Sequence, residues 1–312
     1  MRESVLTMNI FDAVGNTPLF RLRQVYKEER GIRVYGKGEF LNPSGSVKDR
    51  AARAMLLDGL SSGALKPGME ILDATSGSTG IAYSMMAAQL DCRVVLCMPA
   101  NVNRERKQIV KAYGGRIIET HPLEGPEGAL QTATRMAAEQ PGRYFYPDQY
   151  NNDQNWRAHY QTTAEEIWEQ TGGTVTHFVS GTGTSGTFVG TLRRLKERNP
   201  NIRGVLMQPD SPFHGLEGLR HIGTATQRGF FDPRLADMEI AVDTEAAYAM
   251  TRRLAKEEGL LVGISAAANV LAAVETAKQA PADSVIVTVL CDSGTRYLDE
   301  PVWQDAIDKG DN

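Results

Sequence analysis

The chain has 312 residues, of which 41% are hydrophobic and 23% charged, and its formal net charge is −4. This composition gives no basic excess for nucleic acid, and no apolar run reaches the roughly 18 to 20 residues that a membrane span needs. The three cysteines, Cys92, Cys97 and Cys291, match no zinc or disulfide spacing, so we expect no metal site. We expect about two domains and a cytoplasmic protein with reduced thiols.

Short β-rich runs alternate with helical patterns along the chain, which is typical of a parallel sheet covered by helices on both faces. The expected strands are, in chain order, Arg33–Gly38, Glu70–Ala74, Arg93–Met98, Arg116–Glu119, His177–Ser180, Gly204–Gln208 and Val285–Cys291. The expected helices are Lys48–Leu60, Thr79–Leu90, Arg104–Tyr113, Glu127–Glu139, Asn155–Gln170, Thr187–Glu197, Glu245–Glu258 and Ala266–Gln279. The pattern predicts an α/β protein, and the Gly/Pro/Asn-rich stretch 141–155 is the expected passage between two lobes.

Lys48 stands in the run Asn-Pro-Ser-Gly-Ser-Val-Lys-Asp-Arg, which occupies residues 42–50. A lysine amine forms Schiff bases with aldehydes once it is desolvated or otherwise tuned. Lys48 follows a polar turn and begins a helical pattern, where backbone N–H groups gather around anions. A surface lysine is the alternative, and two further loops of matching chemistry argue against it.

The first of these loops, Thr-Ser-Gly-Ser-Thr-Gly at residues 75–80, follows an expected strand and opens a helix. Its hydroxyl groups and free N–H groups predict a receptor for a carboxylate or phosphate. Helix capping is the alternative, but six such residues exceed what a cap needs.

The second loop, residues 181–187, reads Gly-Thr-Gly-Thr-Ser-Gly-Thr and has the same position after a strand. Small residues let backbone amides approach phosphate oxygens, and threonine hydroxyls add donors. The segment also satisfies G-x-G-x-x-G, and Asp210 lies beyond the next strand, so a dinucleotide site is an alternative. That alternative leaves Lys48 and the Thr75 loop unexplained.

Two later segments complete the pattern, Gly-Ile-Ser at residues 263–265 and Cys-Asp-Ser-Gly at residues 291–294. Together with the three segments above, and in this order, they resemble the fold-type II pyridoxal-phosphate enzymes, most closely the cysteine synthase and cystathionine β-synthase family. The resemblance extends from Gly15-Asn16-Thr17-Pro18-Leu19 to Arg296-Tyr297-Leu298.

The resemblance implies a fold like that of the tryptophan synthase β chain, with two lobes that each contain a mostly parallel twisted sheet flanked by helices. Residues 1–40 and 151–312 would form the larger, cofactor-binding lobe, and residues 41–150 a smaller, mobile lobe. A homodimer is typical of the family.

The resemblance also implies site residues around pyridoxal 5'-phosphate, with Lys48 as catalytic residue and internal aldimine. Ser265 would face the pyridine nitrogen, and Ser78 would stand near the ring oxygen. The phosphate would lie among Gly181, Thr182, Gly183, Thr184, Ser185, Gly186 and Thr187. The substrate carboxylate would lie among Thr75, Ser76, Ser78, Thr79 and Gln149.

The implied reaction is β-replacement on an activated L-serine through an α-aminoacrylate, with sulfide as the default nucleophile and L-cysteine as product. Arg220 matches the position where phosphoserine-using members place an arginine, and a guanidinium suits a phosphate better than an acetyl group. O-phospho-L-serine and O-acetyl-L-serine both remain possible donors, and a surface salt bridge is an alternative role for Arg220.

The sequence departs from the family pattern at several positions. Ser78 replaces the usual asparagine, Ala266 and Ala267 replace Ser-Gly, and Cys291 replaces a frequent proline. These departures leave open another nucleophile and a different β-substituted alanine as product. A serine/threonine dehydratase is a further alternative within the cofactor class, and an NAD-dependent dehydrogenase or a non-enzymatic binding protein lies outside it.

Overall fold

The structure is a computed structural model that describes residues 8–223 and 229–303. These residues form two compact units. Unit 1 contains residues 8–15, Asn42–Ser44 and Lys48–Gln154, and unit 2 contains Asn16–Leu41, Gly45–Val47 and the described residues from Asn155 onward.

Unit 2 is built on a sheet of six strands in the order β1-β2-β10-β7-β8-β9. All neighbouring pairs are parallel except β1 with β2. The strands are β1 (Leu19–Arg21), β2 (Arg33–Lys37), β7 (His177–Gly181), β8 (Arg203–Pro209), β9 (Met238–Val242) and β10 (Val285–Val289).

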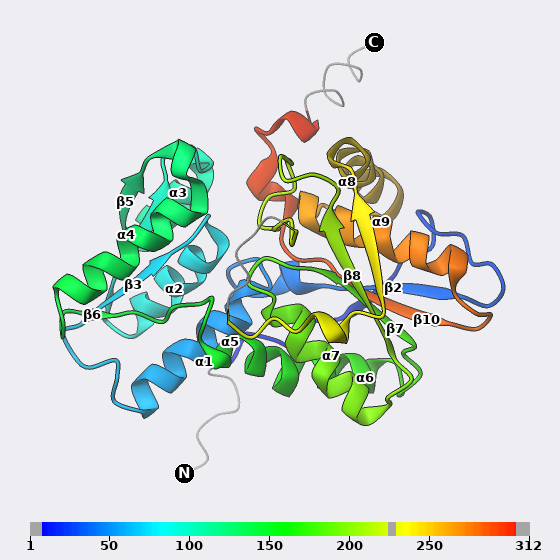
Figure 1. The fold of residues 1–312 in the computed structure, drawn as a ribbon, viewed down its shortest axis with the longest axis horizontal. Helices are drawn as coiled ribbons and strands as arrows, with labels where there is room; N and C mark the ends of the chain where they lie inside the picture. Colours follow the sequence, from blue (N-terminus) through cyan, green and yellow to red (C-terminus); the bar gives the residue numbers. More distant parts are fainter. Residues whose placement is uncertain (1–7, 224–228, 304–312) are drawn as a thin grey trace. The chain divides into compact units, whose positions relative to one another are not determined.

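Helices cover both faces of this sheet (Figure 1). One face carries α8 (Thr244–Glu258) and α9 (Ile264–Gln279), and the other carries α6 (Ala164–Gln170) and α7 (Gly186–Arg198). The central strand β10 is buried along its whole length, and successive side chains enter different cores. Ile286 packs in the core beneath α8 and α9, while Val287 packs with Phe178 and Phe188 on the other side. A strand buried on both faces explains the continuous apolar run in the sequence.

Unit 1 contains a parallel sheet of four strands in the order β5-β4-β3-β6. The strands are β3 (Glu70–Ala74), β4 (Arg93–Pro99), β5 (Arg116–Thr120) and β6 (Tyr144–Phe145), and the main helices are α1 (Lys48–Ser61), α2 (Ser78–Gln89), α3 (Arg104–Ala112) and α4 (Gly125–Glu139). Ile71 packs in a core with residues of α1 and α2, and its neighbour Leu72 packs with residues of α4.

The predicted α/β class, with parallel sheets flanked by helices, is confirmed. Three strands, β1, β6 and β9, were not predicted. The expected helix 155–170 is divided into α5 (Asp153–Ala158), a π-helical turn (His159–Thr163) and α6. The predicted lobe boundaries differ from the units in several places. Leu41 and Gly45–Val47 belong to unit 2, and residues 151–154 belong to unit 1. Residues 8–15 belong to unit 1, because Phe11 packs in the core of that unit with Met55 and Ile81. Among the described helices, none is long and apolar enough to cross a membrane.

Candidate active site

Lys48 is the first residue of α1 in unit 1, and its side chain is half-buried. The turn that precedes it is fixed by Asp49, a fully buried carboxylate that accepts hydrogen bonds from the Ser44 backbone N–H (2.7 Å) and from Ser44 Oγ. An acidic side chain in the first helical turn is favourable because unpaired N–H groups point toward it. The predicted position of Lys48 at a helix start is confirmed.

The Thr75 loop joins the end of β3 to the start of α2. Gly77 has a φ of 140° there, a conformation in which a side chain is strained, and its N–H donates to Thr75 Oγ1 at 3.0 Å. The residue before α2 is Gly77, which has no side chain to cap the helix, and the first turn of α2 contains no acidic residue. The start of a helix with these features favours an anionic ligand.

Gln149 lies against this loop although it is 70 residues from Thr79 in the sequence. Thr79 Oγ1 donates to Gln149 Oε1 at 2.9 Å, and Gln149 Nε2 donates to the Ala74 carbonyl at 2.7 Å. Gln149 is only 3% exposed. The structure thus brings together the unit 1 residues that were predicted to bind a carboxylate, Thr75, Ser76, Ser78, Thr79 and Gln149.

Arg106 on α3 is a contributor to this loop that the sequence analysis missed. Its side chain is 4% exposed, and Nη1 donates to the Ser76 carbonyl at 3.2 Å. A Cβ atom at Gly77 would lie 2.5 Å from Arg106 Cδ, so the glycine makes room for the arginine. A buried cation beside the predicted carboxylate-binding loop attracts a bound carboxylate. In the sequence, Arg106 stands within Arg-Glu-Arg-Lys and looks like part of a solvated helix face.

Asp73, the residue before Ala74 in β3, was also missed. It is fully buried and accepts hydrogen bonds from the Ala74 N–H (2.8 Å) and the Tyr83 hydroxyl (3.0 Å). Burial is the main cause that raises the pKa of Asp73 from 3.8 to about 7. A carboxyl group that titrates near neutral pH therefore lies at the base of the Thr75 loop.

The second glycine-rich loop lies in unit 2 between β7 and α7. Ser185 has a left-handed conformation with φ 75°, and the N–H of Gly186, the first residue of the 13-residue helix that follows, donates to Thr184 Oγ1 at 3.5 Å. A Cβ atom at Gly183 would lie 2.4 Å from the Gly218 carbonyl oxygen, and one at Gly186 would lie 2.0 Å from Asn155 Oδ1. Glycine is therefore required at both positions by the packing of the loop. This segment has several hydroxyl groups, lies at a helix start and has no acidic residue in the first turn of α7, so it fits a phosphate group.

Two buried side chains that the sequence analysis missed hold this loop from α5 and the π-helical turn. Asn155 Nδ2 donates to Thr184 Oγ1 at 3.0 Å, and His159 Nε2 lies 3.3 Å from Thr187 Oγ1. Both side chains are 2% exposed. The periodicity of residues 155–170 predicted a helix, but it does not reveal which side chains face a loop elsewhere in the chain.

Arg220 lies beside the same loop through its backbone, because its N–H donates to the Thr182 carbonyl at 2.9 Å. Ser265 lies in the first turn of α9 and is 6% exposed. The start of α9 is tied to the end of β10 by a hydrogen bond from the Gly263 N–H to the Asp292 carbonyl at 3.0 Å. The predicted unit 2 segments therefore converge at the carboxyl ends of β7 and β10, which is where ligands bind in open α/β sheets.

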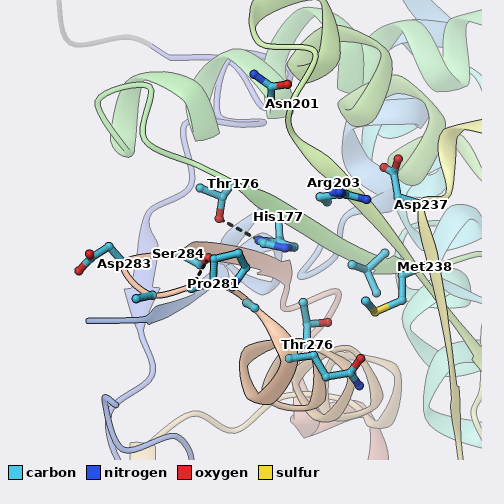
Figure 2. Close-up of a pocket in the computed structure, with 14 residues that line it drawn as sticks. Thr176, His177, Asn201, Arg203, Asp237, Met238, Thr276, Pro281, Asp283 and Ser284 are labelled. Carbon is cyan, nitrogen blue, oxygen red and sulfur yellow. Dashed lines mark hydrogen bonds between the residues drawn. The ribbon is translucent and has the colours of Figure 1, made fainter. Parts of the chain in front are cut away.

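A different cavity of unit 2, of about 480 Å³, lies among residues at the starts of strands β7, β8 and β9 (Figure 2). Its lining includes His177, Arg203 and Asp237, and the hydroxyl of Thr176 lies 2.8 Å from His177 Nδ1. Burial lowers the pKa of His177, and the charge of Arg203 adds to this effect. None of the predicted site residues lines this cavity.

The chain is similar to known proteins over nearly its whole length. A family described as "Pyridoxal-phosphate dependent enzyme" matches residues 10–292. A cysteine synthase from Aquifex aeolicus is 46% identical over 309 residues, which cover 97% of this chain and 93% of the relative. An O-acetylserine dependent cystathionine beta-synthase from Bacillus subtilis is 37% identical and covers 96% and 98% of the two chains. The crystal structure of O-ureido-L-serine synthase superposes with a TM-score of 0.91 at 36% identity, over 98% of each chain. The chain belongs to the family of pyridoxal-phosphate dependent enzymes.

Proposed function

We propose that this enzyme catalyses β-replacement on an activated L-serine and adds sulfide to make L-cysteine. The observation that carries the proposal is the unit 1 receptor, in which the start of α2, Gln149 and the buried Arg106 surround one loop. Such a receptor suits the carboxylate of an amino acid. Membership of the family and the likeness to a cysteine synthase supply the cofactor and the reaction class.

Four groups of residues are proposed to hold the cofactor. Lys48 binds its aldehyde carbon, the loop 181–187 its phosphate, Ser265 its ring nitrogen and Ser78 its ring oxygen. When bound, pyridoxal phosphate supplies an electron sink that acidifies the substrate Cα–H.

The protein's own groups then orient the substrate and move its protons. The loop 75–79 and Gln149 fix the substrate carboxylate, which leaves Lys48 Nζ to accept the Cα proton as general base. Ser265 offers a neutral hydroxyl to the ring nitrogen, and a hydroxyl favours a protonated ring less than a carboxylate would. A ring nitrogen that is less readily protonated favours prompt departure of the β leaving group.

The leaving group of the donor is proposed to be phosphate or acetate. The effect of replacing Arg220 on the rate with each donor distinguishes the two. The backbone N–H of Arg220 donates to the Thr182 carbonyl, which holds the backbone of Arg220 beside the loop proposed to bind the cofactor phosphate. A guanidinium can make two charge-assisted hydrogen bonds to a phosphate dianion.

Two features of this chain bear on the nucleophile. Ser78 is shorter than the family's asparagine, and a likeness to O-ureido-L-serine synthase gives a specific reason to examine nucleophiles other than sulfide. A β-substituted alanine other than cysteine is therefore the second candidate product. A dehydratase would release an oxoacid from serine or threonine without any nucleophile. The family match removes the reason to propose an NAD-dependent dehydrogenase.

The test combines a spectrum with a product screen. We expect the purified protein to have the visible absorbance of a lysine-bound cofactor, and Lys48→Ala to lose it. O-acetylserine and O-phosphoserine should each be supplied with sulfide, with other thiols and with hydroxyurea, and the amino-acid product identified by mass spectrometry. Cysteine as the main product supports the proposal, whereas oxoacid release without a nucleophile contradicts it. We also expect a cytoplasmic homodimer, which sedimentation and cell fractionation can test.

A further inference from the structure

Asn269 on α9 makes hydrogen bonds to the ends of two strands at once. Its Oδ1 accepts from the Gly181 N–H at 2.7 Å, and its Nδ2 donates to the Val289 carbonyl at 2.9 Å and to Cys291 Sγ at 3.3 Å. The side chain is 1% exposed. No motif in the sequence pointed to this residue.

The two strands that Asn269 joins, β7 and β10, are parallel neighbours whose pairing ends at Thr288 and Val179. Beyond that pair, the Gly181 N–H and the Val289 carbonyl are bonded to the Asn269 amide. A buried backbone group without a partner is costly, so a side-chain amide, which has both a donor and an acceptor, suits this position. Aspartate would lack the donor, and alanine would lack both groups.

The contacts of Asn269 connect parts of the proposed cofactor site. Gly181 begins the phosphate-binding loop, and Cys291 follows the end of β10. Ser265 lies four residues before Asn269 on the same helix, so the two side chains share one helical face. One amide therefore sets the start of the phosphate-binding loop relative to the helix that carries Ser265.

We infer that Asn269 is a positioning residue for the cofactor, an inference that rests on the proposed function. It acts through Gly181 on the phosphate-binding loop and through its helix on the distance between that loop and Ser265. Cys291, a departure from the family pattern, is its third partner, which places this departure within the same network.

The experiment compares Asn269→Asp and Asn269→Ala with a control on the same helix. Thr276 is also 1% exposed, and its hydroxyl donates to the Ala272 carbonyl of α9. Thr276→Val therefore removes a buried hydrogen bond without touching the strand ends. For each protein, the cofactor is removed, and the dissociation constant for pyridoxal 5'-phosphate, the ³¹P chemical shift of its bound phosphate and the melting temperature are measured.

We expect both Asn269 variants to bind pyridoxal phosphate at least about 10-fold more weakly, which corresponds to the ~1.4 kcal/mol scale of one hydrogen bond. We also expect them to shift the ³¹P signal. Thr276→Val should lower the melting temperature and leave both cofactor measurements unchanged. If Asn269→Ala does not fold, Asn269→Asp, which has nearly the same shape, provides the comparison.

Asn269 variants that lose only stability, with the dissociation constant and ³¹P signal of the wild type, would overturn the inference and leave the proposed function standing. A wild-type protein that binds no pyridoxal phosphate would instead overturn the proposed function, and the inference with it.

Discussion

The buried carboxyl group of Asp73 makes the stability of this protein depend on pH in a predictable direction. Its pKa is raised from 3.8 to about 7, mainly by burial, so the folded protein resists ionisation of Asp73 more than the unfolded chain does. The unfolded chain therefore releases this proton at lower pH. As a consequence, the free energy of unfolding falls as the pH rises from about 4 to about 7, and the loss is complete above that range.

The substitution Asp73→Asn removes this ionisation and keeps the size of the side chain. The displacement from 3.8 to about 7 corresponds to about 4 kcal/mol at ~1.36 kcal/mol per pKa unit. The amide has only one accepting end, whereas Asp73 accepts from Ala74, Tyr83 and the Gln149 backbone, so we subtract about 1 to 2 kcal/mol for a lost hydrogen bond. We expect the variant to be about 2 to 3 kcal/mol more stable than the wild type at pH 8.

Urea unfolding of the wild type and Asp73→Asn between about pH 5 and pH 8.5 measures this effect, because the stability difference should change with pH as Asp73 titrates. Asp91→Asn is the matched control. Asp91 is an exposed residue of the same unit with φ 52°, a conformation that asparagine adopts readily. For the control, the difference in the free energy of unfolding from the wild type should stay constant across this pH range. A constant difference for Asp73→Asn as well would refute the raised pKa of Asp73.

Three further predictions concern the site. Arg220→Ala should reduce the single-turnover rate with O-phosphoserine about 10- to 100-fold, through loss of a contact worth about 1.5 to 3 kcal/mol, and leave the rate with O-acetylserine nearly unchanged. Equal losses with both donors would show that Arg220 supports the loop structure instead. Arg106→Gln should raise KM for the amino-acid donor by about 10-fold, because it removes a buried charge beside Ser76, and Arg106→Lys should raise KM less. An unchanged KM with a lower melting temperature would limit Arg106 to a structural role. Ser265→Asp should increase the proton affinity of the cofactor's ring nitrogen, because a neighbouring anion favours the cationic ring; an unchanged cofactor spectrum and rate would show that Ser265 does not face the ring.

The positions of most helices and strands followed from the sequence because they depend on local patterns. The apolar run at Val285–Val289 and the charged face of α7 are examples. Short strands escaped this reasoning, since two residues such as Tyr144–Phe145 have no period of their own and become a strand only by pairing with β3. The assignment of residues 8–15 to unit 1 likewise depends on where Phe11 packs.

The sequence by itself determined the family and the loops that carry its chemistry, because Lys48, the Thr75 loop and the loop 181–187 are contiguous runs with distinctive composition. The tertiary structure alone decided which distant side chains serve those loops. Arg106 and Asn269 owe their roles to partners 30 and 88 residues away, so no local pattern marks them. The family resemblance named Gln149, but only the fold shows that it bonds to Ala74, 75 residues away. The same holds for the raised pKa of Asp73, because burial by the surrounding fold is its main cause, and burial is a property of the packed chain rather than of any segment.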